Sequence, residues 1–84
     1  MRVIQIRVRL FAALREEIGK EVMEFEVPHG ASCQEVFEYL ESQFAFLTPL
    51  LERSLVAVNG FYAAKDALLS RGDEVVLLPP VSGG

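Results

Sequence analysis

The chain has 84 residues, of which 51% are hydrophobic and 24% are charged, so it forms one globular domain at most, with room for one modest core. Its net charge of −4 argues against nucleic acid as a partner, because that binding depends on Lys and Arg neutralising phosphates. One Cys and one His exclude an intrachain disulfide, and also a zinc-ribbon or iron–sulfur site built from this chain alone.

The N-terminal segment predicts a strand followed by a short helix. Apolar and polar side chains alternate over residues 3–10, which is the pattern of a half-buried strand. The apolar spacing becomes helical over residues 11–18, and Gly19 follows where a helix favours a left-handed residue.

Residues 21–27 alternate again and predict a second strand. Its outward residues include Glu24 and Glu26, which are acidic. The outward residues of the first strand include Arg7 and Arg9, which are basic. Because opposite charges stabilise neighbouring strands, we expect these residues to face one another across an antiparallel pair.

The middle of the chain predicts the main helix. Ser32 and Glu35 have the spacing of a capping box, and an apolar stripe at helical spacing follows, so we expect a helix over residues 33–46. Pro49 is expected to end any continuation of this helix.

Several side chains near this helix are candidates for chemistry that we assign to the fold instead. Cys33 could carry a persulfide near a helix N-terminus, but its place on the apolar stripe favours a buried, inert thiol. His29 has no nucleophilic or acidic partner at motif spacing, so we interpret it as a turn residue. Phe44, Phe46 and Leu47 are assigned to the core.

The C-terminal half predicts a hairpin and a last strand. Residues 55–58 form a strand, Asn59-Gly60 is a strong hairpin turn, and residues 61–63 return. After a turn at Gly72, the apolar run at residues 74–78 is typical of a central strand.

The order of these elements favours an α+β roll. We expect a mixed sheet of about five strands, with the first and last side by side, one long helix across it and a short extra helix. A split β-α-β, ferredoxin-like sandwich is the alternative, but it needs a second long helix and residues 63–71 are short for one. The predicted division is a domain over residues 1–78 and an extended tail over residues 79–84.

The tail carries the candidate chemistry. Pro79 and Pro80 favour a stiff, extended exit from the sheet, and Gly83 and Gly84 have no side chains. Such a tail could pass through a narrow channel and present a terminal carboxylate in a remote pocket. The alternative is a loose terminus without function, because chain ends are often small and polar.

A carboxylate must be activated before it can accept a nucleophile, most simply as an acyl-adenylate. The sequence has no G-x-x-x-x-G-K-[ST] and no G-x-G-x-x-G motif, so ATP would come from a partner enzyme. The activated acyl group could then accept sulfur, giving a thiocarboxylate, or an amine, giving an amide.

Three stretches together resemble a known family. They are Leu-Phe-Ala-Ala-Leu-Arg-Glu at residues 10–16, Val-Asn-Gly at residues 58–60, and the run from Gly-Asp-Glu to Pro-Pro-Val-Ser-Gly-Gly at residues 72–84. The chain resembles the ubiquitin-like β-grasp sulfur carriers, and within them the molybdopterin synthase small-subunit branch (MoaD type). The resemblance implies a β-grasp roll.

The resemblance also implies a reaction cycle. A ubiquitin-activating-like adenylyltransferase adenylates Gly84, and a sulfur donor enzyme converts the adenylate to a thiocarboxylate. The tail then enters the large subunit of molybdopterin synthase and delivers sulfur to cyclic pyranopterin monophosphate. The large subunit supplies the catalytic side chains, so this chain is not an enzyme alone. No cofactor is expected to stay bound, and ATP is used by the activating partner.

Site residues follow from matching positions. Gly84 holds the reacting group, Gly83 gives a narrow neck, and the residues that position them are Pro79, Pro80, Val81 and Ser82. The resemblance places partner contacts at Phe11, Tyr62, Leu78 and Val81, with Arg15 as a polar anchor.

The remaining expectations concern location and assembly. No apolar run approaches the ~18–20 residues needed to cross a bilayer, and the N-terminus lacks a signal-peptide core, so we expect a cytoplasmic protein with no membrane partner. The resemblance implies a heterotetramer with the large subunit. A ubiquitin-like protein modifier, a carrier for thiamine synthesis or tRNA thiolation, and a non-covalent interaction module remain open as alternatives.

Overall fold

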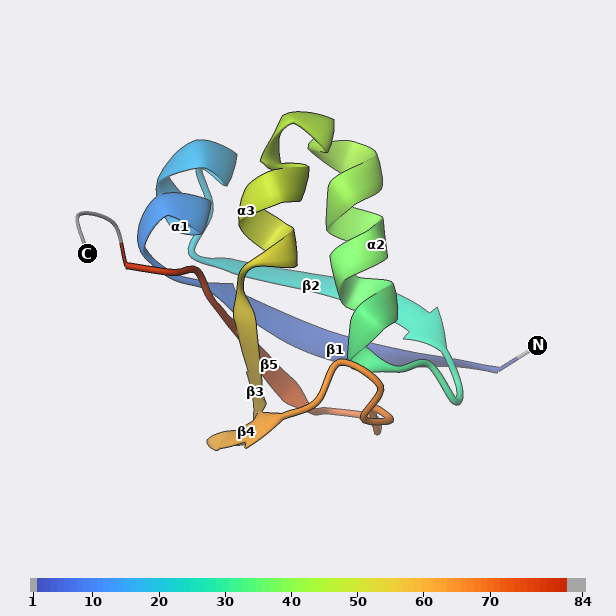
Figure 1. The fold of residues 1–84 in the computed structure, drawn as a ribbon. Coiled ribbons are helices and arrows are strands. Elements are labelled where there is room, and N and C mark those ends of the chain that lie inside the picture. The colour runs from blue at the N-terminus through green and yellow to red at the C-terminus, as the bar shows by residue number, and fades with distance from the viewer. Residues whose placement is uncertain (1, 82–84) are drawn as a thin grey trace.

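A five-stranded mixed sheet with helices on one face forms the body of the protein (Figure 1). The computed structural model describes residues 2–81. Its elements in chain order are β1 (Val3–Leu10), α1 (Ala12–Ile18), β2 (Val22–Pro28), α2 (Cys33–Gln43), the 3-10 helix η1 (Ala45–Leu47), α3 (Thr48–Glu52), β3 (Leu55–Val58), β4 (Phe61–Ala63) and β5 (Glu74–Leu78).

The sheet has the strand order β2-β1-β5-β3-β4. β1 and β5 are parallel neighbours, and the other neighbouring pairs are antiparallel. The predicted β-grasp roll is therefore confirmed. No helix forms in the described residues between β4 and β5, which is where a ferredoxin-like sandwich would need one.

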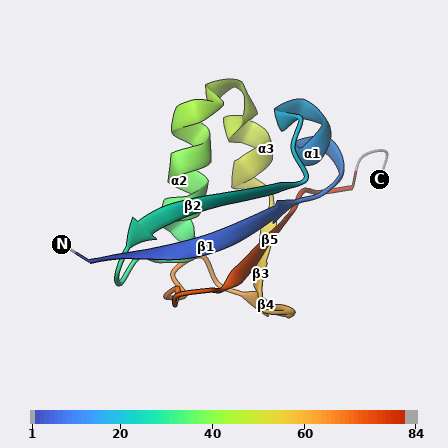
Figure 2. The same ribbon diagram turned by 180° about the vertical axis from the view of Figure 1, so that it is seen from behind.

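The core lies between the sheet and its helices. β1 buries every second side chain, Ile4, Ile6, Val8 and Leu10, against the helices. In both views all the helices lie above the sheet, so the opposite face of the sheet carries no helix of the described residues (Figures 1 and 2). We call this uncovered surface the open face. No helix among residues 2–81 is long and apolar enough to span a membrane.

Local signals fixed two helix ends as predicted. Gly19 ends α1 in the left-handed conformation, with φ at 83°. The N–H of Ser32 donates to Glu35 Oε2 at 3.0 Å as half of the capping box that begins α2. α2 itself ends at Gln43, three residues before the predicted end at residue 46.

The prediction for Pro49 is wrong. Pro49 lies in the first turn of α3 instead of ending the helical region. The first turn of a helix tolerates proline because its N–H groups have no partner within the helix. The chain therefore turns at η1 and adds a short helix that the sequence pattern did not indicate.

The assignment of Phe46 to the core is also wrong. Phe46 is 68% exposed, whereas Leu47 is buried and Phe44 packs against the core. In a 3-10 helix with three residues per turn, Phe44 and Leu47 lie on one side and Phe46 points away from it.

The predicted charge pairing between β1 and β2 holds at one position. Arg7 faces Glu24, and their side chains lie 3.0 Å apart. Arg9 instead pairs with Glu74 of β5 at 3.5 Å, and Glu26 faces a glutamine of β1. Arg9 lies two residues after Arg7 in β1, where the pairing with β2 ends. At this position β1 also borders the central strand β5.

Candidate functional site

The open face has an apolar half. Cross-strand pairing in β3, β4 and β5 brings together Leu55 with Leu78, and Ala57 with both Val76 and Tyr62. Their neighbours along the strands, such as Val56 and Leu77, are buried on the helix side, so these five side chains share the open face. We call Leu55, Ala57, Tyr62, Val76 and Leu78 the apolar patch.

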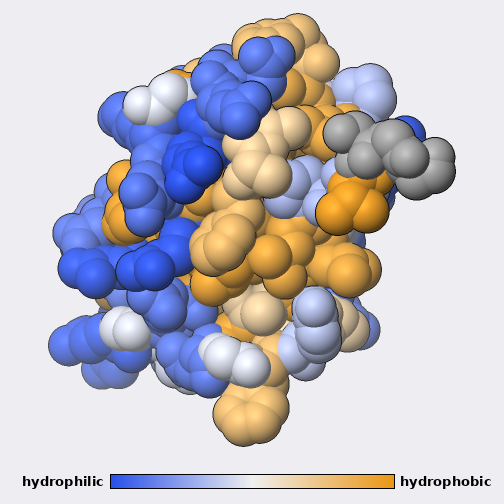
Figure 3. All heavy atoms as spheres, turned by 90° about the vertical axis from the view of Figure 1, so that its left-hand side faces the viewer, coloured by the Kyte–Doolittle hydropathy of each residue, from blue (hydrophilic) through white to orange (hydrophobic). Residues whose placement is uncertain are grey.

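The exposure of this patch is unusual for large apolar residues. Leu55 is 60% exposed and Tyr62 is 75% exposed. Figure 3 shows apolar side chains gathered in a continuous band at the end of the sheet, with hydrophilic side chains along one border. An exposed apolar patch with a polar border is typical of a surface that binds another protein.

The chain leaves the sheet directly beside this patch. We call residues 79–81 the tail root. Pro79 and Pro80 are half-buried and Val81 is 89% exposed. Because β5 is a central strand, the tail root continues from the most firmly held part of the sheet. The predicted site residues Ser82, Gly83 and Gly84 lie outside the described residues.

A groove lies on the other side of the tail root, between α1 and α3. Its volume is about 540 Å³. It is lined by Ala12, Ala13 and Glu16 from α1, by Leu50 and Arg53 at α3, and by the tail root itself. The walls are mostly apolar, and Glu16 and Arg53 contribute charges of opposite sign. The tail root is thus flanked by two different surfaces.

The structure brings part of the predicted contact set together. Tyr62 and Leu78 both lie in the apolar patch. Leu10 pairs with Leu77 in the sheet, so Phe11 and Leu78 each follow that pair directly. Phe11 is 42% exposed, although it immediately follows a strand with a fully buried face. Arg15 lies on α1 and is exposed.

Sequence reasoning left Ala12, Ala13 and Glu16 of α1 out of the site, although they line the groove. It also missed five residues elsewhere beside the tail root. Leu55, Ala57 and Val76 belong to the apolar patch, and Leu50 and Arg53 line the groove. Leu55, Ala57 and Val76 alternate with buried residues along β3 and β5. That alternation indicates a shared surface only when the pairing of the two strands is known. Leu50 and Arg53 had no signal, because α3 was not predicted.

A hydrogen-bonded clasp fixes the start of β5 to the β3–β4 hairpin. Asn59 Nδ2 donates to Asp73 Oδ1 at 2.9 Å, and the N–H of Glu74 donates to Asn59 Oδ1 at 3.0 Å. Asp73 Oδ2 accepts a third bond from the N–H of Ser70 at 2.7 Å. Asn59 also has a φ of 51°, which asparagine tolerates well. The clasp therefore joins two turns that are far apart in the sequence.

This clasp gives a prediction about stability. Asn59→Ala removes both side-chain bonds and puts a less tolerant residue at positive φ, so we expect a loss of about 1–3 kcal/mol in the free energy of unfolding. Urea denaturation measures the loss. Asn59→Asp alone should also destabilise, because it sets a second carboxylate beside Asp73.

The matched control exchanges the two groups. Asn59→Asp combined with Asp73→Asn keeps every donor opposite an acceptor and leaves the net charge unchanged. We expect the double variant to recover most of the stability lost in Asn59→Asp. Equal losses in the single and double variants would show that the clasp is unimportant.

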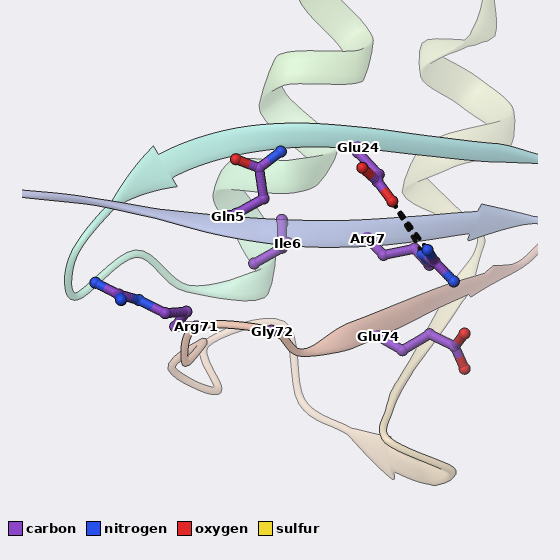
Figure 4. A pocket seen from close by; sticks show the side chains of 7 residues that line it. All are labelled: Gln5, Ile6, Arg7, Glu24, Arg71, Gly72 and Glu74. Carbon is purple, nitrogen blue, oxygen red and sulfur yellow. Dashed lines mark hydrogen bonds and ion pairs between the residues drawn. The ribbon is translucent and has the colours of Figure 1, made fainter.

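A second pocket lies on the charged half of the open face (Figure 4). It has a volume of about 370 Å³ and is lined by Gln5, Ile6, Arg7, Glu24, Arg71, Gly72 and Glu74. Arg7 is already paired with Glu24, and the side chains of Arg71 and Glu74 point to opposite ends of the pocket. Its charges do not converge on one point, so we assign it no chemistry.

The described residues offer little catalytic chemistry of their own. No group of three or more His, Cys, Asp or Glu side chains among residues 2–81 could hold a metal ion. Cys33 is completely buried, and its burial, together with the charge of Asp73, raises the pKa of the thiol. A buried thiol that resists ionisation is a poor nucleophile, so the prediction of an inert Cys33 agrees with its surroundings.

Comparison with known families gives a match over most of the chain. A model of the ThiS family matches residues 8–84. The molybdopterin synthase sulfur carrier subunit of Arabidopsis thaliana is 31% identical over 81 residues, which cover 96% of this chain and 84% of that protein. The subunit of the same description in Dictyostelium discoideum is 34% identical over 83 residues, covering 95% of this chain and 96% of its own.

Solved structures agree on the fold. SAMP1 from Haloferax volcanii has a TM-score of 0.81 at 28% identity and covers 95% of this chain and 99% of its own. A putative molybdopterin converting factor, subunit 1, from Pyrococcus furiosus has a TM-score of 0.81 at 29% identity, covering 93% of this chain and 99% of its own. Ubiquitin from Caldiarchaeum subterraneum has a TM-score of 0.67 at 17% identity, with 99% and 100% coverage, which is a similarity of fold alone.

Proposed function

This chain belongs to the ThiS family, in its molybdopterin synthase branch of ubiquitin-like sulfur carriers, and from that premise we propose that Gly84 is the group that carries sulfur. The observation that supports this most is the position of the tail root. It leaves the central strand β5 between an exposed apolar patch and a groove. A partner can hold the body by these surfaces while the tail reaches into the partner's own site.

The first step activates the tail. A partner adenylyltransferase binds ATP, and the Gly84 carboxylate attacks the α-phosphate, so that pyrophosphate leaves and an acyl-adenylate forms. The carboxylate needs this step because it is ionised at neutral pH, with a usual C-terminal pKa of about 3.3–3.7, and is a poor electrophile. The chain's own contribution is to present the carboxylate, so it binds no permanent cofactor.

The second step exchanges oxygen for sulfur. Hydrosulfide supplied by a donor enzyme attacks the acyl carbon, AMP leaves with the bridging oxygen, a proton is lost, and a thiocarboxylate remains on Gly84. The tail then enters the large subunit of molybdopterin synthase, where the thiocarboxylate sulfur attacks a carbon of cyclic pyranopterin monophosphate, displaces an oxygen substituent and forms a thioester. Water hydrolyses this thioester, which leaves the sulfur on the pterin and restores the Gly84 carboxylate, so the carrier can be used again. The catalytic side chains belong to the large subunit.

The folded body aims the tail in each complex. Tyr62 and Leu78 give the partner an apolar surface to bury, and Phe11 extends that surface beside the tail root. Pro79 and Pro80 restrict the backbone, so less entropy is lost when the tail becomes ordered in a channel. Gly83 is narrow enough to pass where a side chain would not. We propose a heterotetramer with the large subunit, and a cytoplasmic location.

Intact-mass spectrometry tests this proposal. The chain is incubated with the adenylating enzyme of the same organism, MgATP and a sulfide source, with a matched sample that lacks ATP. We expect the mass to increase by the difference between sulfur and oxygen, only when ATP is present. An unchanged mass, in a reaction where the same enzyme loads a known carrier, would contradict the proposal.

Protein modification is a second candidate, which one comparison favours. The Haloferax volcanii protein at 28% identity is named a small archaeal modifier protein. In that case an amine, rather than sulfur, displaces AMP and forms an isopeptide bond with Gly84. Proteolysis of cell extract would then release lysine residues that carry the C-terminal residues of this chain. Their absence, together with sulfur loading, leaves the carrier function alone.

A further inference from the structure

Ala12 has a backbone conformation that its residue type does not favour. Among residues 2–81, two non-glycine residues have positive φ, Ala12 at 50° and Asn59 at 51°. The left-handed region is unfavourable for residues with a Cβ atom, and asparagine is one of the few that adopts it often. Asn59 is also compensated by the side-chain bonds of the clasp. Alanine has no such compensation.

Buried residues on both sides hold Ala12 in place. Leu10 at the end of β1 is 1% exposed, and its N–H donates to Glu21 O at 2.8 Å. Leu14 in α1 is fully buried, and its N–H donates to Phe11 O at 3.1 Å. The chain must turn from a strand into a helix between these anchors, with α1 beginning directly after β1 (Figure 1). The surrounding fold thus imposes the strain.

Glycine would meet the backbone requirement without strain. The methyl group of Ala12 therefore serves a purpose other than backbone conformation, and its location in the groove indicates that purpose. Ala12 lines the groove between α1 and α3, and the lining of the same groove includes Pro79, Pro80 and Val81. Strained residues often persist where the strain serves a site.

We propose that the methyl group of Ala12 is a positioning group, which limits how the tail root can lie in the groove and so aims the tail at a partner's site. This inference rests on the proposed function. With glycine at this position the groove loses part of its wall, and the tail root can adopt more directions. Ordering the tail in a partner's channel then costs more entropy. Once the complex has formed, the same groups react in the glycine variant and in the wild-type chain.

Ala12→Gly tests this inference, because the substitution should stabilise the fold and at the same time weaken binding to the adenylating enzyme. Relief of the strain should raise the Tm by about 3 °C. The apparent KM of the chain for its adenylating enzyme should rise about fourfold, as expected if the tail root gains about four times as many accessible directions that binding must restrict. ATP–pyrophosphate exchange measures KM, and the kcat of this reaction should stay unchanged.

Ala12→Ser is the matched variant, because it keeps the Cβ atom and should keep the wild-type KM. An unchanged KM in Ala12→Gly would overturn the inference. A lower Tm in Ala12→Gly would also overturn it, because the methyl group would then serve the fold. If the wild-type chain supports no exchange at all, the proposed function itself fails, and this outcome is distinct from a failure confined to Ala12.

Discussion

Removing Gly83 and Gly84 will abolish sulfur loading and leave the folded body intact. The shortened chain ends at Ser82, whose side chain and shorter reach keep its carboxylate out of the channel that the tail enters. The sheet, the core and the apolar patch all lie within the described residues 2–81. We therefore expect no thiocarboxylate by intact mass, an unchanged Tm, and retained binding to the large subunit.

A chain with one residue added after Gly84 is the matched control for length. It keeps both glycines and all of the body, but the carboxylate lies one residue too far along the tail. We expect no loading here either. Sulfur loading at the wild-type rate in either variant would show that the position of the terminal carboxylate is unimportant. A large fall in Tm for the shortened chain would show that its last residues stabilise the fold.

Leu78→Asp will weaken binding to the large subunit by about 30- to 100-fold, which is about 2–3 kcal/mol. Leu78 lies in the apolar patch, directly before the tail root, and pairs with Leu55 across the open face. In a complex the new carboxylate would be buried in an apolar contact without a partner, which is strongly unfavourable. In the free protein Leu78 is half-buried, so the Tm should fall modestly while the chain stays folded at the temperature of the titration. Isothermal titration calorimetry measures the Kd.

Val22→Asp is the matched control for this substitution. Val22 is also an exposed apolar residue on a strand, at 37% exposure, but it lies on the edge strand β2, where it pairs with Arg9, and β1 and β5 separate it from β3 and β4. We expect its Kd to remain at the wild-type value. If the two variants bind equally well, the apolar patch is not the contact surface. If both weaken binding equally, the effect is one of net charge.

The fold was predictable where local chemistry decides the structure. Alternation defined β1 and β2, the pair of Ser32 and Glu35 began α2, and Asn59 with Gly60 made the hairpin turn. Each of these signals acts over a few residues, so a single sequence contains it. The parallel neighbours β1 and β5 followed from the order of elements and the apolar character of the last strand.

The site was less predictable because its residues meet through tertiary packing. Pro49 was expected to end a helix, and the wrong prediction concealed α3 and with it Arg53 in the groove. Arg9 pairs with Glu74 through the register of the parallel β1 and β5 strands, and the order of elements predicts that these strands are neighbours but not their register. The positive φ of Ala12 had no signal either, since alanine is not a residue that predicts a left-handed turn.

The proposed cycle requires sulfur to be carried at the end of the chain and not elsewhere in it. The only thiol is Cys33, which is buried among core side chains with a raised pKa. Fragmentation of the loaded chain in a mass spectrometer locates the added sulfur to a residue. We predict the sulfur in the smallest C-terminal fragments, which contain Gly84. Sulfur found in fragments that contain Cys33, with unmodified C-terminal fragments, would contradict the proposal that Gly84 carries the sulfur.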